Sequence, residues 1–85
     1  MSKAGKLLKR FLSKPTDFTW DEFRRLMRGF GYVEVNKGKT SGSRVSFVEP
    51  ETKHIISLHK PHPHPTLKQY QLKQVEEALI EKGVI

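Results

Sequence analysis

The sequence predicts an α+β domain in which two long helices pack on one face of a three-stranded antiparallel sheet, after a short N-terminal helix. Residues 20–29 and 66–82 space their apolar side chains with the period of an α-helix. Between them, residues 31–36, 44–49 and 54–59 alternate apolar and polar side chains, as half-buried strands do. Because the connections between these strands are short, they favour an antiparallel meander.

Length and composition limit the classes of function. The 85 residues are enough for one domain, and 16 Lys+Arg against 9 Asp+Glu give a net charge of +7. Such a charge on a small domain predicts a polyanionic partner, although a basic domain without a nucleic-acid role stays an alternative. We expect no small-molecule cofactor, because so short a chain cannot enclose a large cavity.

The lack of cysteine and of a long apolar segment predicts where in the cell the protein acts. There is no cysteine, which excludes disulfides and thiolate zinc sites and fits a reducing cytoplasm. No apolar run approaches the roughly 20 residues of a membrane helix. We therefore expect a cytoplasmic protein with no membrane partner, while the basic, acid-free N-terminus keeps open the alternative of an organelle transit peptide.

Residues 3–13 can form a short amphipathic helix that ends before Pro15. Its apolar face consists of Leu7, Leu8, Phe11 and Leu12. A helix this short is marginal alone, so it must dock on the body of the domain or on a second subunit. We interpret residues 1–17 as an N-terminal extension and linker, and residues 18–85 as the functional domain.

The helix at 20–29 has a complete start signal. Thr19 and Glu22 have the spacing of a capping box, in which each side chain accepts a hydrogen bond from a free backbone N–H. Phe18 and Phe23 have the spacing of a hydrophobic staple. The polar face carries Arg24, Arg25 and Arg28. These arginines could meet phosphate or an acidic protein, but solvated surface arginines are the commoner reading.

If both long helices cover one face of the sheet, the other face is left for water or a partner. We expect this second face to be basic. At the end of the third strand, His59 should lie on it with Ile55 and Ser57, while Leu58 faces the core. An exposed His59 near Arg44 could serve as a base or a phosphate contact. The alternative is an ordinary histidine at a strand end.

Residues 37–43 form a loop rich in lysine, glycine and hydroxyl groups, whose amides could hold phosphate. The alternative is a solvated hairpin turn. The candidate RNA contacts in and around this loop are Lys37, Lys39, Ser43, Arg44 and Lys60. The proline-rich segment 60–68 should be extended and exposed, since prolines cannot continue a ladder.

The four histidines raise the question of a metal. They are His54, His59, His62 and His64. No cysteine and no suitably spaced carboxylate accompanies them, so we expect no physiological metal site. His62 and His64 alternate with prolines, which suits a role in capping a loop or in recognising a partner.

Several pieces of the sequence, in their order, resemble a known family. They are FRRLMRGFGYVEV, the Gly42-Ser43 pair entering the second strand, ISLHKPHPHP, and the closing LKQYQLKQVEEALIEKGVI. The order helix–strand–strand–strand–helix resembles the double-stranded-RNA-binding-domain fold. In detail, residues 18–85 are similar to the HicA toxins of bacterial toxin–antitoxin systems. The resemblance implies a small ribonuclease that cuts mRNA, and a HicB antitoxin that covers its active site.

The resemblance also implies a catalytic histidine one or two positions after the Gly-Ser pair. Those positions are Arg44 and Val45 here. Neither side chain can shuttle a proton at neutral pH. We therefore assign candidate catalytic roles to Arg44 and His59, and the question of cleavage stays open.

Three functions follow from these patterns. The leading hypothesis is a HicA-like toxin that binds mRNA and cleaves it as an endoribonuclease. The second is a non-catalytic RNA-binding module on the same fold, which the missing histidine favours. The third is an interaction domain for an acidic, antitoxin-like partner, to which RNA binding would be incidental.

Overall fold

The computed structural model describes residues 3–35, 44–61 and 64–85. The elements are α1 (Lys3–Leu12), α2 (Trp20–Gly29), β1 (Val33–Val35), β2 (Arg44–Glu49), β3 (His54–His59) and α3 (Gln69–Lys82). The strands form one sheet in the order β1-β2-β3, and both neighbouring pairs are antiparallel. The predicted α+β class, with three helices and a three-stranded antiparallel sheet, is confirmed.

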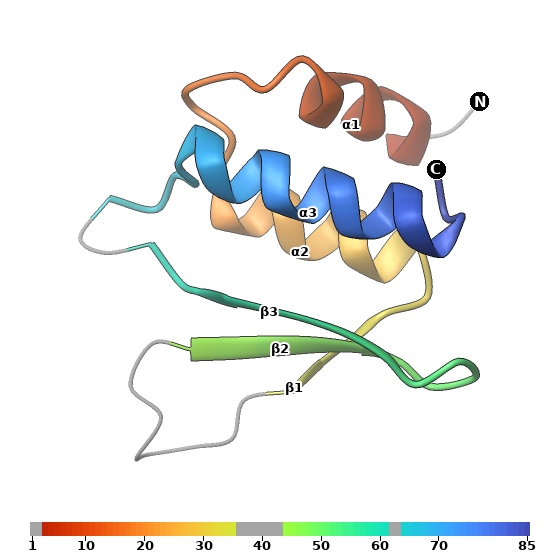
Figure 1. The fold of residues 1–85 in the computed structure, drawn as a ribbon. Helices are drawn as coiled ribbons and strands as arrows, with labels where there is room; N and C mark the ends of the chain where they lie inside the picture. Colours follow the sequence, from red (N-terminus) through yellow and green to blue (C-terminus); the bar gives the residue numbers. More distant parts are fainter. Residues whose placement is uncertain (1–2, 36–43, 62–63) are drawn as a thin grey trace.

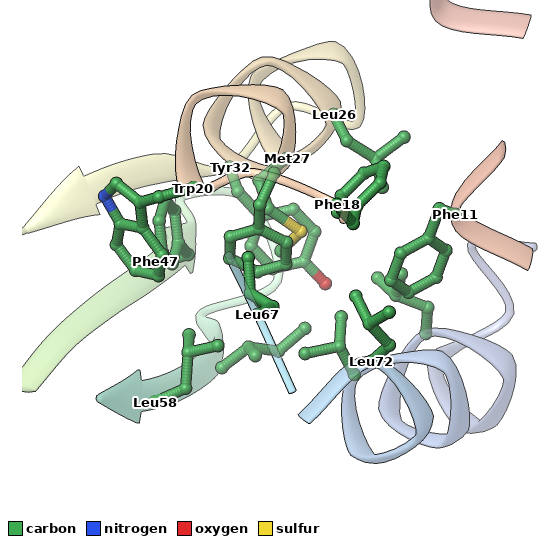
Figure 2. Close-up of a cluster of buried hydrophobic side chains, with 14 of the residues drawn as sticks. Phe11, Phe18, Trp20, Leu26, Met27, Tyr32, Phe47, Leu58, Leu67 and Leu72 are labelled. Carbon is green, nitrogen blue, oxygen red and sulfur yellow. The ribbon is translucent and has the colours of Figure 1, made fainter. Parts of the chain in front are cut away.

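The hydrophobic core lies between the sheet and the helices. In Figure 1, α2 and α3 both lie above the strands, and α1 lies beyond them on the same side. Figure 2 shows how aromatic rings meet there. The ring of Phe47 on β2 lies 5.1 Å from that of Phe23 and 5.8 Å from that of Trp20, both on α2. Alternate residues of β2 and β3 reach this core: Val45, Phe47, Ile56 and Leu58.

Helix α2 begins as the sequence predicts. The Thr19 hydroxyl accepts a hydrogen bond from the Glu22 N–H (3.1 Å), and the Glu22 carboxylate accepts one from the Thr19 N–H (2.9 Å). Phe18 and Phe23 are both fully buried beside this cap. The capping box is thus formed by residues close in sequence, which is why it could be recognised there.

Strand β1 is shorter than the predicted 31–36. Gly31 has a φ of +92°, a left-handed conformation that glycine adopts without steric cost. The Tyr32 N–H then donates to the Met27 carbonyl (3.0 Å), so Tyr32 belongs to the end of the preceding helix. The ladder therefore starts only at Val33. Residue 36 lies outside the described residues.

Helix α1 docks on the body of the same chain. Phe11 is 1% exposed, and its ring lies 5.8 Å from that of Phe18. Arg10 forms ion pairs with Asp17 (3.0 Å) and Glu22 (2.9 Å), and Lys14 forms one with Glu76 of α3. The segment read from the sequence as an extension thus contributes a side chain to the core.

The proline-rich segment was predicted to be extended and exposed, and this is wrong for part of the described chain. Leu67 is 2% exposed within the core (Figure 2). The Leu67 N–H donates to the Phe18 carbonyl and the Trp20 N–H to the Pro65 carbonyl, each at 2.8 Å. This short antiparallel pairing holds residues 65–67 against residues 18–20 and inserts Leu67 inward. As a result α3 begins at Gln69, three residues later than predicted.

Candidate functional site: the open face of the sheet

The second face of the sheet, which we call the open face, is turned away from the helices in Figure 1. Alternation along the strands places eight residues on it: Val33, Val35, Arg44, Ser46, Val48, Ile55, Ser57 and His59. Val33 is 52% exposed and Ile55 is 58% exposed, which is far above the exposure of side chains on the core face. This face is therefore accessible to a macromolecular partner.

The open face is not uniformly basic, so that expectation is wrong for the described residues. The strand register divides the face into rows. One row is apolar and consists of Val33, Val48 and Ile55. The next joins Val35 to Ser46 and Ser57, and the last pairs Arg44 with His59. Among the eight residues, Arg44 alone carries a permanent positive charge, so polarity is graded from one end of the face to the other.

Arg44 and His59 stand directly opposite each other across the β2–β3 ladder, and both are exposed. Side chains in such a cross-strand pair have Cβ atoms about 4.5–5.5 Å apart. A guanidinium and an imidazole can therefore act on the same bound group. Val45, the other position singled out by the resemblance, is 4% exposed and faces the core. It cannot contact a partner on the open face.

Two hydroxyls lie beside the Arg44–His59 pair. The Oγ atoms of Ser46 and Ser57 are 2.8 Å apart and share one hydrogen bond. One of the two hydroxyls donates to the other, which leaves the second O–H available to a ligand. The polar end of the face thus combines a fixed cation, an imidazole and a hydroxyl pair.

Gln71 fixes the end of β3, and sequence reasoning missed it. Its side-chain Nε2 donates to the His59 carbonyl (3.0 Å), and its Oε1 accepts from the Lys68 N–H (3.0 Å). Gln71 is 7% exposed. It lies four residues before Val75, in the buried stripe of α3. A polar residue in a buried stripe needs hydrogen-bond partners, and this was the signal that could have identified it.

The other predicted site residues have varied positions. Lys60 follows His59 and is exposed. Lys37, Lys39 and Ser43 lie outside the described residues, as does His62. Within the described part of the chain, no group of three His, Asp or Glu side chains could hold a metal ion.

His54 lies away from the open face. Its Nδ1 is 2.6 Å from the Tyr32 hydroxyl, with which it shares a hydrogen bond. Burial raises the pKa of Tyr32 above its ordinary value, and the nearby Glu49 carboxylate adds to this effect. The pair closes the far end of the core, which indicates a structural role.

The fold defines a small α+β protein with one sheet face free and a polar pair at its end. Residues 20–81 match the sequence model of a family described as the HicA toxin of bacterial toxin–antitoxin systems. Because this match covers well over half of the chain, the protein belongs to the HicA toxin family. No significant match was found among curated proteins or solved structures.

Membership in a toxin family implies an antitoxin partner. The matched residues 20–81 include α2, the sheet and most of α3. Helix α1 lies outside the match. In the described residues, no helix is both long enough and apolar enough to cross a membrane.

Proposed function

We propose that this HicA toxin binds mRNA across the polar end of its open face and cleaves it as an endoribonuclease. The observation that carries the proposal is the cross-strand pairing of Arg44 with His59 on an exposed surface. A cation and a proton-transfer group on one spot are what phosphodiester cleavage requires. The net charge of +7 supports RNA as the partner.

The proposed chemistry starts at the 2′-hydroxyl of the RNA. The His59 imidazole takes the 2′-hydroxyl proton, and the 2′-oxygen forms a bond to the adjacent phosphorus. The bond from phosphorus to the 5′-oxygen of the next nucleotide breaks, and that oxygen takes a proton from water. Arg44 donates hydrogen bonds to the phosphoryl oxygens, where negative charge develops. Lys60 adds positive charge next to the pair, and Lys37, Lys39 and Ser43 extend the proposed RNA contacts along the chain.

We further propose that the antitoxin is HicB-like and covers the open face. The apolar row of Val33, Val48 and Ile55 supports this, because exposed apolar side chains grouped on one surface favour a protein contact. Such a partner would block access to the Arg44–His59 pair. The site of action that fits an mRNA substrate and a cysteine-free chain is the cytoplasm.

A non-catalytic RNA-binding module is the second candidate function, and a specific observation favours it. The position that the resemblance assigns to the catalytic imidazole holds Arg44, and Val45 beside it is buried. Among the described residues of the open face, His59 is then the imidazole that must transfer the proton. If His59 only contacts phosphate, RNA is bound and released intact.

The test incubates the purified chain with end-labelled mRNA and measures cleavage and binding separately. We expect His59→Ala to lower the cleavage rate at least about 100-fold, the usual contribution of a positioned acid or base, with affinity changed only a few-fold. Arg44→Ala should weaken both, and Arg44→Lys should restore binding more than cleavage, because lysine cannot form a bidentate pair with phosphate. Lys73→Ala on α3, also an exposed cation, is the matched control and should change neither.

Two results would decide against cleavage by this pair. Binding without cleavage by the unaltered protein would favour the non-catalytic module. Full cleavage by His59→Ala would remove His59 from the mechanism. A protein that binds an acidic partner but no RNA at low salt would leave the third function, an interaction domain.

A further inference from the structure

A hollow of about 560 Å³ lies next to the polar end of the open face, between the end of β3 and the start of α3. His59 lines it and also belongs to the open face, so the hollow and the open face meet at this residue. The ionisable residues among the described lining residues of the hollow are His59, Lys60, His64, Lys68 and Tyr70. None of the described lining residues is acidic. The hollow is therefore suited to an anion.

The walls of the hollow are held in place by hydrogen bonds among three parts of the chain. Gln71 joins the end of β3 to the first turn of α3 through the His59 carbonyl and the Lys68 N–H. The Gln69 side chain donates to the Lys14 carbonyl (2.8 Å), which ties α3 to the segment that follows α1. These bonds fix the relative positions of the end of β3, the start of α3 and Lys14.

Among the described residues that line the hollow, no carboxylate matches the positive charge. Lys68 is the N-cap residue of α3, and its ammonium group cannot accept a hydrogen bond from the helix. The first turn of α3 contains no acidic residue. The partial positive charge of the helix start thus adds to the ammonium groups of Lys60 and Lys68. A phosphate group is the anion that two lysines and nearby imidazoles fit best.

An aromatic ring completes the lining. Tyr70 is 60% exposed, although most of the protein's aromatic side chains lie in the core. A ring at the edge of a phosphate-sized cationic site offers a surface on which a nucleobase can stack. The volume of about 560 Å³ lies within the usual range of small-ligand sites, which is about 300–1,000 Å³.

We propose that this hollow is a nucleotide subsite, in which Lys60 and Lys68 hold a phosphate and Tyr70 stacks on the attached base. An RNA strand that passes the Arg44–His59 pair would place a neighbouring nucleotide there. The subsite then sets the position of the strand relative to His59, and so the phosphate that is attacked. This inference rests on the proposed function. It adds that the site recognises the phosphate and the base of one nucleotide next to the phosphate that is attacked.

The experiment measures binding of a fluorescein-labelled, 2′-O-methyl ten-nucleotide RNA, which cannot be cleaved, by anisotropy over a salt series. Tyr70→Ala should weaken binding about 5-fold or more, as expected for the loss of one stacked base, and Tyr70→Phe should bind as the unaltered protein does. Lys68→Ala should weaken binding and reduce the slope of log affinity against log salt by about one.

Matched controls separate the hollow from general basic charge. Lys73→Ala removes an exposed lysine from the same helix outside the lining, and should leave both the affinity and the salt slope unchanged. The thermal unfolding midpoint of each variant should match that of the unaltered protein, because Lys68 and Tyr70 are exposed.

The outcomes distinguish this inference from the proposed function. If Arg44→Ala weakens RNA binding but Tyr70→Ala and Lys68→Ala do not, the subsite is refuted and the proposed function stands. Equal losses in Tyr70→Phe and Tyr70→Ala would refute stacking, and equal losses in Lys73→Ala and Lys68→Ala would refute a localised phosphate contact. If the unaltered protein binds no RNA, both proposals fail together.

Discussion

The two long helices of this toxin share one half of a capping box, since Glu22 and Gln71 each accept a hydrogen bond from the N-cap N–H, but the two helix starts differ in charge. At the start of α2, Thr19 and Glu22 cap each other's backbone, and Arg10 from α1 pairs with the Glu22 carboxylate. At the start of α3, a lysine occupies the N-cap position, no acidic residue follows in the first turn, and a hollow opens beside it. At the start of α2, side chains of the protein itself cap the backbone and supply negative charge. At the start of α3, no acidic side chain of the first turn neutralises the positive end of the helix.

The two helix starts therefore differ in how much their own residues stabilise the helix. Acidic side chains in the first turn of α2 complement the positive end of the helix and stabilise it. The start of α3 lacks this stabilisation, and α3 is held instead by the Gln71 bonds and by its buried stripe. The helix that is less stabilised by its own sequence is the one whose start borders the hollow. The following variants test this contrast, from the largest expected effect to the smallest.

Phe11→Ala should destabilise the protein most. It removes a ring that is 1% exposed and detaches α1, which brings Arg10 to the start of α2. The free energy of unfolding should fall by about 3–5 kcal/mol, the range for such a cavity in a core. Urea unfolding followed by circular dichroism measures this. Leu12→Ala, one position along and 40% exposed, should cost far less, and an equal loss in both would show that α1 is not docked through Phe11.

Gln71→Leu should have an intermediate effect on stability, because it leaves the His59 carbonyl and the Lys68 N–H without their side-chain partners. Loss of such buried bonds costs about 1–3 kcal/mol. Hydrogen exchange should also speed up selectively at the Lys68 amide. Gln74→Leu, at an exposed position of the same helix, is the control. If both variants were equally stable, the link between β3 and α3 would not depend on Gln71.

Glu22→Gln should have the smallest effect and a characteristic pH dependence. Burial opposes ionisation of Glu22, but hydrogen bonds from the Arg10 guanidinium and the Thr19 N–H outweigh it and lower the pKa below 4.5. A lowered pKa stabilises the fold above pH 4.5, and this contribution is lost as pH falls through the folded-state value. At pH 7 the variant should be less stable by about 1 kcal/mol, as for other helix caps.

The same pair of proteins gives the pH test. The difference in unfolding free energy between the unaltered protein and Glu22→Gln should shrink as the pH is lowered below about 4.5. Chemical denaturation from pH 7 to pH 3 measures it. Glu77→Gln, at an exposed position of α3, should track the unaltered protein throughout. A constant difference over this range would show that ionisation of Glu22 does not stabilise α2.

The parts of the fold that sequence could predict are those decided by neighbouring residues. The cap of α2 needs only Thr19 and Glu22, three positions apart, and the faces of β2 and β3 follow from alternation. Leu67 was expected only at the margin of the buried stripe of the 66–82 helix, because its full burial depends on hydrogen bonds between its segment and residues about fifty positions earlier. No local pattern contains such a pairing.

The candidate site divides in the same way. Alternation placed His59 on the side opposite Leu58, and Arg44 was expected nearby, but only the register sets the two directly opposite each other. The expectation of a basic face failed because most cations of the described chain belong to helices or to the hollow, while strands supplied valine and isoleucine to that face. Net charge predicts a polyanionic partner, but it says little about which surface would bind that partner.

The position of α1 determines how far this toxin can be truncated and still fold. The segment shared with its family begins at Trp20, yet Phe11 fills space in the same interior as Phe18. A recombinant fragment that starts at Trp20 would lack both rings, and it would expose the apolar core surface that they cover. We expect that fragment to aggregate, so the smallest stably folded fragment includes residues that precede the segment matched by the family model.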